Sequence, residues 1–327
     1  MGLQELLGIA SNFQEARALL TAHDLGVFDA VGRGKGARRL AESLETSPRG
    51  TEILLDALVA MGLLRKRGSR YYNARIAERY LVTTSPHYMG PVLKLNGYMW
   101  ERWSRLGEAV RGGHLPKAER EFVSDPVKNR NFILAMDLLG HETAGKVARR
   151  LDLRGVRRVL DVGGGPGHYS MALVERSPRI EAVIVDLPLT LRVAREVIEG
   201  RGMRGKVKTR EGDFFDPRCD LGEGYDLALA SNILHIEDSA HNLDLLRRIY
   251  GALNPGGTVV VNEILVDAAR TRPKEAALFA INMLAATARG NVYTRGEISS
   301  WLRTAGFMKI RTVRLDERGT LLIGRRP

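Results

Sequence analysis

Apolar residues follow two different spacings along this 327-residue chain. Up to about residue 150 they recur every three or four positions, as in the stretches 16–23 and 54–61, which predicts a mostly helical half. From Arg157 onward, short apolar runs alternate with helical stretches. Strands that are apolar on both faces and separated by helices predict an α/β fold, with a mostly parallel sheet covered on two sides.

The last two apolar runs, MKIRTVRL and GTLLIGRR, are separated only by Asp316–Gly319. This gap has no room for a crossover helix, so the two runs are predicted to form an antiparallel hairpin at the edge of the sheet. We expect a helical domain over residues 1–115, bridging helices over 116–150 and the α/β domain over 151–327. Glycines and prolines in Gly107–Pro116 mark the expected break after the first domain.

The segment Gly36–Tyr80 predicts a winged helix-turn-helix: a helix, a turn, a second helix and two short strands joined at Arg67–Ser69. Ser47 before Pro48 combines an N-cap residue with a proline at the first helical position. The first helices also carry more apolar residues than a domain of this size needs for its own core, which predicts a homodimer. Among these residues are Phe13, Leu19, Leu20, Leu25 and Phe28.

Composition and charge narrow the class of protein. With 44% apolar and 27% charged residues, the chain has the proportions of an ordinary globular protein. The net charge of +12 is spread over both halves, so it does not indicate nucleic-acid binding by itself. Cys219 is the only cysteine, so neither an intrachain disulfide nor a cysteine-based zinc site is expected, and no metal is predicted. A chain without disulfides suits a reducing compartment, so a cytoplasmic location is expected. No run approaches the ~18 apolar residues of a membrane span, and Glu5 and Leu6 do not fit a secretion or lipidation signal.

The sharpest motif is VLDVGGGPGHYS, at Val159–Ser170. A predicted strand ends at Asp161–Val162, and the glycines turn the chain into a helix. Glycine lets the backbone approach a ligand closely and adopt positive φ, and a helix N-terminus offers unpaired N–H groups to an anion. A nucleotide-type cofactor is therefore indicated, although an ordinary strand-to-helix turn is the alternative for this motif alone. The NAD fingerprint needs glycine or alanine where this chain has His168.

Two further acids end the next two predicted strands. Asp186 lies 23 residues after Gly163, near the ~20-residue spacing of an acid that binds ribose hydroxyls. Asp213, followed by Phe214, suits the amino group and ring of adenine. With Asp161 these acids are expected to line one crevice at the carboxyl ends of parallel strands, where ligands bind in open α/β sheets. Taken singly, each acid is also a suitable helix cap.

These motifs, in this order and spacing, resemble one known family. LDVGGGPGHYS, VIVDLP, GDFF, SNILHI and NPGGTVVVNEIL make the second half similar to the class I S-adenosylmethionine-dependent methyltransferases, which have a Rossmann-like fold. The whole chain resembles the small-molecule O-methyltransferases typified by caffeate, hydroxyneurosporene and anthracycline methyltransferases, and its helical half resembles their dimerisation domain. The resemblance implies transfer of a methyl group from S-adenosylmethionine to a hydroxyl of a small aromatic or polyene acceptor.

The resemblance also implies roles for individual residues. The Asp161–Gly167 loop would hold the methionine end of the cofactor, Asp186 the ribose, and Asp213 with Phe214 the adenine. The full set implied to bind the cofactor is Asp161, Gly163, Gly165, Asp186, Asp213, Phe214 and Ser231. The set implied to surround the acceptor is Phe132, Met136, Met283 and Thr287. At helical spacing, Phe132 and Met136 also fit an ordinary core face.

His235 is implied to be the catalytic base, and its surroundings agree. SNILHIED follows a predicted strand, so His235 falls at the cofactor end of the sheet. A phenol with a pKa of about 10 must lose its proton to become a good nucleophile, and imidazole is a suitable general base. Glu263, at the end of the neighbouring strand, is expected to orient the ring. The alternative is a histidine that only caps or packs at a strand end. The other histidines considered, His114, His141, His168 and His241, are expected at the surface or in loops.

Two positions depart from the pattern of the plant enzymes. Val292 stands where they have a second glutamate beside the histidine, and Ser231 stands where they have a cofactor-facing lysine. C-methylation, or cofactor binding without methyl transfer, therefore stays open. A DNA-binding regulator that reads with the helix Pro48–Met61 is disfavoured, because acids in that helix would repel phosphates. Trp100 and Trp103 suit either the acceptor pocket or a dimer core.

Overall fold

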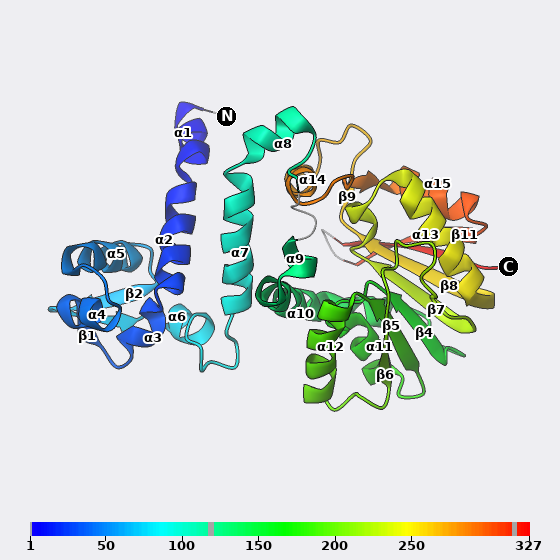
Figure 1. Cartoon of the computed structure of the whole chain (residues 1–327), viewed down its shortest axis with the longest axis horizontal. Coiled ribbons are helices and arrows are strands. Elements are labelled where there is room, and N and C mark those ends of the chain that lie inside the picture. The colour runs from blue at the N-terminus through cyan, green and yellow to red at the C-terminus, as the bar shows by residue number, and fades with distance from the viewer. Residues whose placement is uncertain (1, 117–120, 316–318) are drawn as a thin grey trace. The chain divides into compact units, whose positions relative to one another are not determined.

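The computed structural model describes residues 2–116, 121–315 and 319–327 (Figure 1). It divides the chain into two compact units, Met1–Met99 and Trp100–Pro327. Within the described ranges, no helix is both long and apolar enough to cross a membrane. The finer division at residues 115 and 150 stays a prediction.

The first unit contains the predicted winged helix. Its elements are β1 (Lys35–Gly36), α4 (Ala37–Ser43), α5 (Pro48–Ala60), β2 (Leu64–Arg67) and β3 (Arg70–Asn73). The two predicted strands β2 and β3 pair antiparallel, and β1, which was not predicted, pairs with the other edge of β3. The Ser47 hydroxyl caps α5 by accepting a hydrogen bond from the N–H of Gly50 at 3.0 Å. Asp56 of α5 accepts hydrogen bonds from the Tyr71 hydroxyl and the Lys66 ammonium group, both at 2.7 Å, so this acid ties the helix to the wing.

The remaining elements of the first unit are helices. They are α1 (Leu3–Ser11), α2 (Phe13–Asp24), α3 (Val27–Val31), α6 (Arg75–Tyr80) and most of α7 (Gly90–Trp103). Two of the five apolar residues assigned to a surplus surface, Leu20 and Phe28, are instead buried. Phe28 belongs to the core of this unit, because α3 packs on the winged helix. Phe13 and Leu25 are exposed, as predicted.

A seven-stranded sheet organises the second unit, with the order β11-β12-β8-β7-β4-β5-β6. The strands are β4 (Arg158–Val162), β5 (Glu181–Asp186), β6 (Val207–Glu211), β7 (Tyr225–Ser231), β8 (Leu253–Glu263), β11 (Met308–Arg314) and β12 (Thr320–Arg325). From β6 to β8 the strands run parallel, whereas β12 is antiparallel to both β8 and β11. The predicted α/β sheet with an antiparallel C-terminal pair is confirmed; residues 316–318 of its connection lie outside the described residues.

Helices cover both faces of this sheet, as the apolar strands predicted. Side chains of α10 (Pro126–Arg150), α11 (His168–Arg176) and α12 (Pro188–Gly200) form the core on one face. Those of α13 (Ser239–Ala252) and α15 (Arg295–Thr304) form the core on the other. The remaining elements are α8 (Leu106–Gly112), α9 (Glu121–Ser124), the short turn η2 (Leu234–Ile236), β9 (Leu265–Val266), α14 (Lys274–Ala286) and β10 (Tyr293–Thr294).

The break predicted over Gly107–Pro116 is wrong in its first part. Residues Leu106–Gly112 form α8, despite a glycine near its start and another at its end. The helix is stabilised by packing, since Ala109 is buried together with Leu115 and Ala285 of α14. The chain leaves the helix at Gly113, whose φ of +82° favours glycine.

Candidate active site

The carboxyl ends of the parallel strands bring most of the predicted site residues to one edge of the sheet. Asp161 is the penultimate residue of β4, Asp186 ends β5 and Glu263 ends β8. His235 lies in η2, the turn that follows β7. Asp213 does not close its strand as predicted, because β6 ends two residues earlier and Asp213 belongs to the following loop.

The glycine turn between β4 and α11 adopts the predicted conformation. Gly163, Gly165 and Gly167 have φ values of +63°, +54° and +85°, in the left-handed region that favours glycine. A Cβ atom on Gly163 would lie only 2.5 Å from the side chain of Ile233, so this turn also passes very close to the segment after β7. A Cβ atom on Gly165 would instead meet open space.

Asp161 lies fully buried beneath the glycine turn. Its Oδ2 accepts a hydrogen bond from the Ser170 hydroxyl at 2.7 Å, whereas Oδ1 has no partner among the residues that the structure describes. Burial, and secondarily the charge of Asp186, raises the pKa of Asp161 to about 7. An unpartnered buried oxygen of this kind is expected to receive a donor from a ligand or water.

Asp186 is held by two backbone N–H groups. Its carboxylate accepts hydrogen bonds from Gly165 at 2.9 Å and from Leu187 at 2.7 Å, which fixes it against the glycine turn. Burial outweighs these contacts and raises the pKa of Asp186 to about 6. A carboxylate has about four acceptor positions, so this one retains capacity for ligand hydroxyls.

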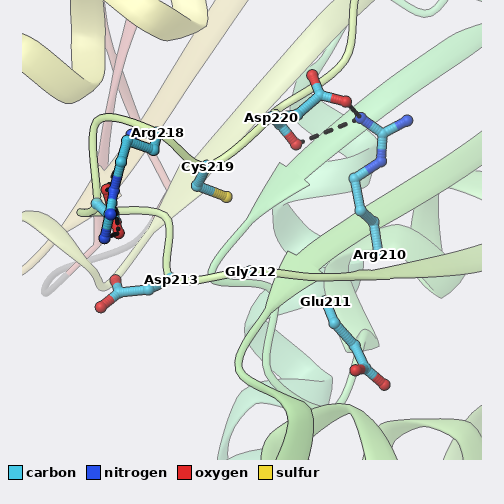
Figure 2. A pocket seen from close by; sticks show the side chains of 8 residues that line it. Arg210, Glu211, Gly212, Asp213, Arg218, Cys219 and Asp220 are labelled. Atoms are coloured by element: carbon cyan, nitrogen blue, oxygen red, sulfur yellow. Dashed lines mark hydrogen bonds and ion pairs between the residues drawn. The ribbon is translucent and has the colours of Figure 1, made fainter.

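Asp213 lines an open hollow of about 790 Å³ beyond the end of β6 (Figure 2). The hollow contains two arginines that already have partners, since Arg210 pairs with Asp220 and Arg218 with Asp216, both at 2.7 Å. Asp213 itself is exposed, and its carboxylate accepts a hydrogen bond from the N–H of Phe215 at 3.0 Å. Phe214 is buried and faces the glycine turn, where its ring would lie 3.0 Å from a Cβ atom on Gly163.

His235 and Glu263 form the predicted pair. The Nδ1 atom of His235 lies 2.8 Å from Oε2 of Glu263, and both residues are buried. The other carboxylate oxygen of Glu263 accepts hydrogen bonds from the N–H groups of Ile233 and Leu234, each at 2.7 Å. Since a carboxylate only accepts hydrogen bonds, Nδ1 carries the proton in the neutral ring and Nε2 presents a lone pair. Within the described residues, no hydrogen bond reaches Nε2.

Several residues around this pair were not predicted. The ring of Phe279, from α14, meets the His235 ring edge to face at 5.0 Å. The Tyr169 hydroxyl accepts a hydrogen bond from the side-chain amide of Asn262 at 2.8 Å, and burial together with the charge of Asp161 raises the pKa of Tyr169 to about 12. Tyr169 stands within the glycine motif, but nothing in its spacing indicated that its hydroxyl turns toward β8.

Comparison with known proteins follows the same division of the chain. A family model described as the O-methyltransferase domain matches residues 119–308, and one described as the O-methyltransferase dimerisation domain matches residues 7–83. The chain belongs to the O-methyltransferase family. Together with the order of the sheet, this membership confirms the predicted fold class, a class I methyltransferase domain with an added dimerisation domain.

Individual relatives of this O-methyltransferase cover nearly its whole length. It is 37% identical to 3-hydroxy-5-methyl-1-naphthoate 3-O-methyltransferase of Streptomyces sahachiroi, over 96% of this chain and 92% of the relative. It is 32% identical to the tetracenomycin polyketide synthesis 8-O-methyl transferase of Streptomyces glaucescens, over 100% and 97%. The crystal structure of human N-acetylserotonin methyltransferase in complex with S-adenosylmethionine matches with a TM-score of 0.85 and 27% identity, over 100% and 99%.

The protein is thus an O-methyltransferase that uses S-adenosylmethionine, and the residues at this edge of the sheet fit this cofactor. The unpartnered Asp161 Oδ1 and the spare acceptor positions of Asp186 suit the donor groups of the cofactor. Ser231, which ends β7, also has a buried hydroxyl without a partner among the described residues. The open space at Gly165 leaves room for a ligand against the backbone.

Of the residues implied to surround the acceptor, Phe132 and Met136 lie on α10 and Met283 lies on α14, and Thr287 directly follows α14. Phe132 is half-buried and stacks on Phe122 with ring centres 5.1 Å apart. Met136 is half-buried one turn further along α10, and Met283 is buried. The Thr287 hydroxyl donates to the carbonyl of Met283 and accepts from the N–H of Gly290, both at 2.8 Å, so it caps the end of α14.

Val292 and His168 are both buried. Val292 is 1% exposed and packs with Val266 and Ala276, so its side chain belongs to a small apolar cluster. The expectation that His168 is a surface or loop residue is wrong. His168 begins α11 beneath Gly140 of α10, where a Cβ atom would lie 2.3 Å from its Nε2, and burial lowers the pKa of His168 to about 4.

Proposed function

We propose that this enzyme transfers a methyl group from S-adenosylmethionine to a hydroxyl of a small aromatic acceptor, with His235 as the general base. The observation that carries the proposal is the contact between His235 Nδ1 and Glu263 Oε2 at 2.8 Å. It fixes the tautomer in which Nε2 accepts a proton, and Glu263 stabilises the imidazolium that forms.

The acidic crevice is proposed to hold the cofactor. Asp186 would accept hydrogen bonds from the ribose hydroxyls, Asp213 with Phe214 would bind the adenine, and Asp161 with the glycine turn would hold the methionine end. Ser231 lies at the same edge of the sheet and completes this set. When bound, the cofactor supplies a methyl group on a positively charged sulfur. The residues of the enzyme then orient the acceptor oxygen, and His235 removes its proton.

The acceptor is proposed to be a flat aromatic ring that carries a hydroxyl. Phe132, Met136 and Met283 offer apolar and polarisable surfaces that suit such a ring, and Phe279 adds an aromatic wall beside the base. The naphthoate and tetracenomycin methyltransferases among its relatives support this class.

The test is incubation of the purified enzyme with S-adenosylmethionine and a panel of hydroxylated naphthoates, anthraquinones and indoles, followed by mass spectrometry of the products. We expect a gain of one methyl on oxygen. His235→Gln is then expected to lower kcat by roughly 10²–10⁴ while leaving cofactor affinity intact. Methylation on carbon, or near-normal turnover of His235→Gln, contradicts the proposal.

The assembly is proposed to be a homodimer built mainly by residues 1–115. Besides Phe13 and Leu25, the helix α1 exposes Leu3, Leu6, Leu7 and Ile9. So many exposed apolar side chains on one helix favour association, because a partner subunit that covers them removes apolar surface from water. Light scattering at micromolar concentration should give the mass of two chains, and the mass of one chain would contradict the proposal.

A further inference from the structure

The segment that follows α14 contacts the main chain at His235 and just after it. The N–H of Asn291 donates to the carbonyl of His235 at 3.0 Å, and the Tyr293 hydroxyl donates to the carbonyl of Glu237. At Gly290 the two segments nearly touch, because a Cβ atom there would lie 2.3 Å from the carbonyl oxygen of His235. We call residues 287–293 the clamp segment.

An ion pair at the surface also joins the clamp segment to the segment that carries His235. The guanidinium group of Arg289 donates to both carboxylate oxygens of Glu237, from Nε at 2.7 Å and from the terminal nitrogen at 3.0 Å. A two-point pair of this kind fixes the direction of both side chains. The Arg289 side chain is 49% exposed, and Glu237 is 17% exposed. Arg289 thus joins the clamp segment to a residue two positions beyond His235.

The opposite side of the His235 turn is held from the sheet and from α13. Glu263 accepts from the N–H groups of Ile233 and Leu234. The Asn242 side chain donates to the carbonyls of Leu234 and Glu237, at 2.7 and 3.0 Å. A three-residue 3-10 turn has little stability of its own, so the position of the imidazole depends on these two sets of anchors.

We propose that Arg289 is a positioning residue for His235, which it holds through Glu237 and the main chain of the turn. The inference rests on the proposed role of His235 as the base. Val292 gives the clamp segment no carboxylate with which to hold the imidazole ring. The same segment instead fixes the backbone that carries the ring, and Arg289 is the part of it that forms a charged, two-point contact.

The test is steady-state kinetics of the full-length enzyme with S-adenosylmethionine and an acceptor that it methylates. Arg289→Ala is expected to lower kcat about tenfold, because small displacements of a catalytic group are costly. The KM for both substrates and the calorimetric affinity for S-adenosylmethionine should stay unchanged. Arg289→Lys, which keeps the charge but not the two-point geometry, should recover part of the lost kcat.

Arg130→Ala is the matched control. Arg130 has a half-exposed side chain and pairs with Glu196 at 2.6 Å, between α10 and α12. Loss of an exposed ion pair alone should change neither the melting temperature nor kcat appreciably. An Arg289→Ala enzyme with the parent kcat overturns the proposal, and so does an Arg289→Lys enzyme as slow as Arg289→Ala.

A second experiment separates this inference from the proposed function. In a His235→Gln background, Arg289→Ala should cause no further loss, since both residues act through the same group. A further tenfold loss there would mean that Arg289 acts elsewhere, and would overturn its assignment while leaving His235 as the base. Near-normal turnover of His235→Gln alone overturns the general-base proposal itself, and this inference with it.

Discussion

The two ends of the proposed site are held in place by different means. At the end formed by Asp161, Gly163–Gly167 and Asp186, the Ser170 hydroxyl and backbone N–H groups hold two buried carboxylates, whose pKa values are raised to about 7 and about 6. At the end formed by His235 and Glu263, side chains and main-chain groups from several elements satisfy one another. We call these the glycine corner and the histidine corner.

The difference separates two kinds of sensitivity. Burial of carboxylates is unfavourable without full hydrogen bonding, so stability and cofactor affinity at the glycine corner should depend on bound ligand and on pH. At the histidine corner the protein itself supplies the hydrogen bonds to Glu263 and to His235 Nδ1. There kcat should depend on small changes in geometry instead. Each of the following variants acts on one corner and spares the other.

The largest effect in the histidine corner besides that of His235→Gln is expected from Glu263→Gln. Glutamine can offer its oxygen to the N–H groups of Ile233 and Leu234 only by turning its NH₂ group toward His235 Nδ1. That contact favours the tautomer with the proton on Nε2, which cannot accept another. We expect kcat to fall roughly 10–100-fold, less than for His235→Gln, with unchanged cofactor affinity. Equal kcat values for Glu263→Gln and the parent enzyme would contradict the tautomer argument.

Asp186→Ala should act on the glycine corner alone. Hydrogen bonds to a charged group contribute about 1.5–3 kcal/mol each, so the calorimetric Kd for S-adenosylmethionine should rise at least ~tenfold. At saturating cofactor, kcat should be nearly retained. Asp152→Ala, which removes an exposed acid paired with Arg154, is the control and should leave the Kd unchanged. A folded Asp186→Ala protein with the parent affinity would remove Asp186 from the cofactor site.

Acid should weaken cofactor binding through the same residue. With its pKa raised to about 6, Asp186 is mostly ionised at pH 7.5 and mostly protonated at pH 5 in the free protein. The protonated form is the weaker acceptor, so the Kd should rise by up to about tenfold between these pH values. In Asp186→Ala this part of the pH dependence should disappear, and its persistence there would assign it to another group.

The effect expected of Asp161→Asn is on stability. The pKa of Asp161 is raised from 3.8 to about 7 on folding, so between these pH values the native state binds more protons than the unfolded state. Its contribution to the free energy of unfolding therefore falls as pH rises from about 4 to 7. Asparagine preserves an acceptor for Ser170 and does not ionise. Urea denaturation at pH 5 and pH 8 should show a smaller decrease for Asp161→Asn than for the parent, and parallel decreases would contradict the assignment.

The glycine corner could be predicted almost completely from the sequence because its parts are local. The turn is one continuous motif, and Asp186 ends a strand whose apolar pattern marks its length. Asp213 was placed to within two residues, since a loop after a strand has no periodicity to set its boundary.

The histidine corner was predicted only where it touches a strand end. His235 follows β7, and Glu263 ends β8. Phe279 contacts His235 from α14, and Arg289 contacts Glu237 from the loop after α14, both from positions distant in sequence. Asn242 holds the turn from α13. Their directions depend on how those elements pack, which leaves no local pattern. The burial of His168 beneath Gly140 was missed for the same reason.

Cys219 offers a site for chemical labelling beside Asp213. It is the one thiol of the chain, it is partly exposed and lines the hollow in Figure 2, and its sulfur would lie 2.4 Å from a Cβ atom on Gly212, beside Asp213. Burial raises the pKa of this thiol, so alkaline conditions will favour its alkylation. A small environment-sensitive fluorophore attached there would stand next to Asp213, which is proposed to bind the adenine, and would give an optical signal of ligand exchange in an otherwise unmodified enzyme.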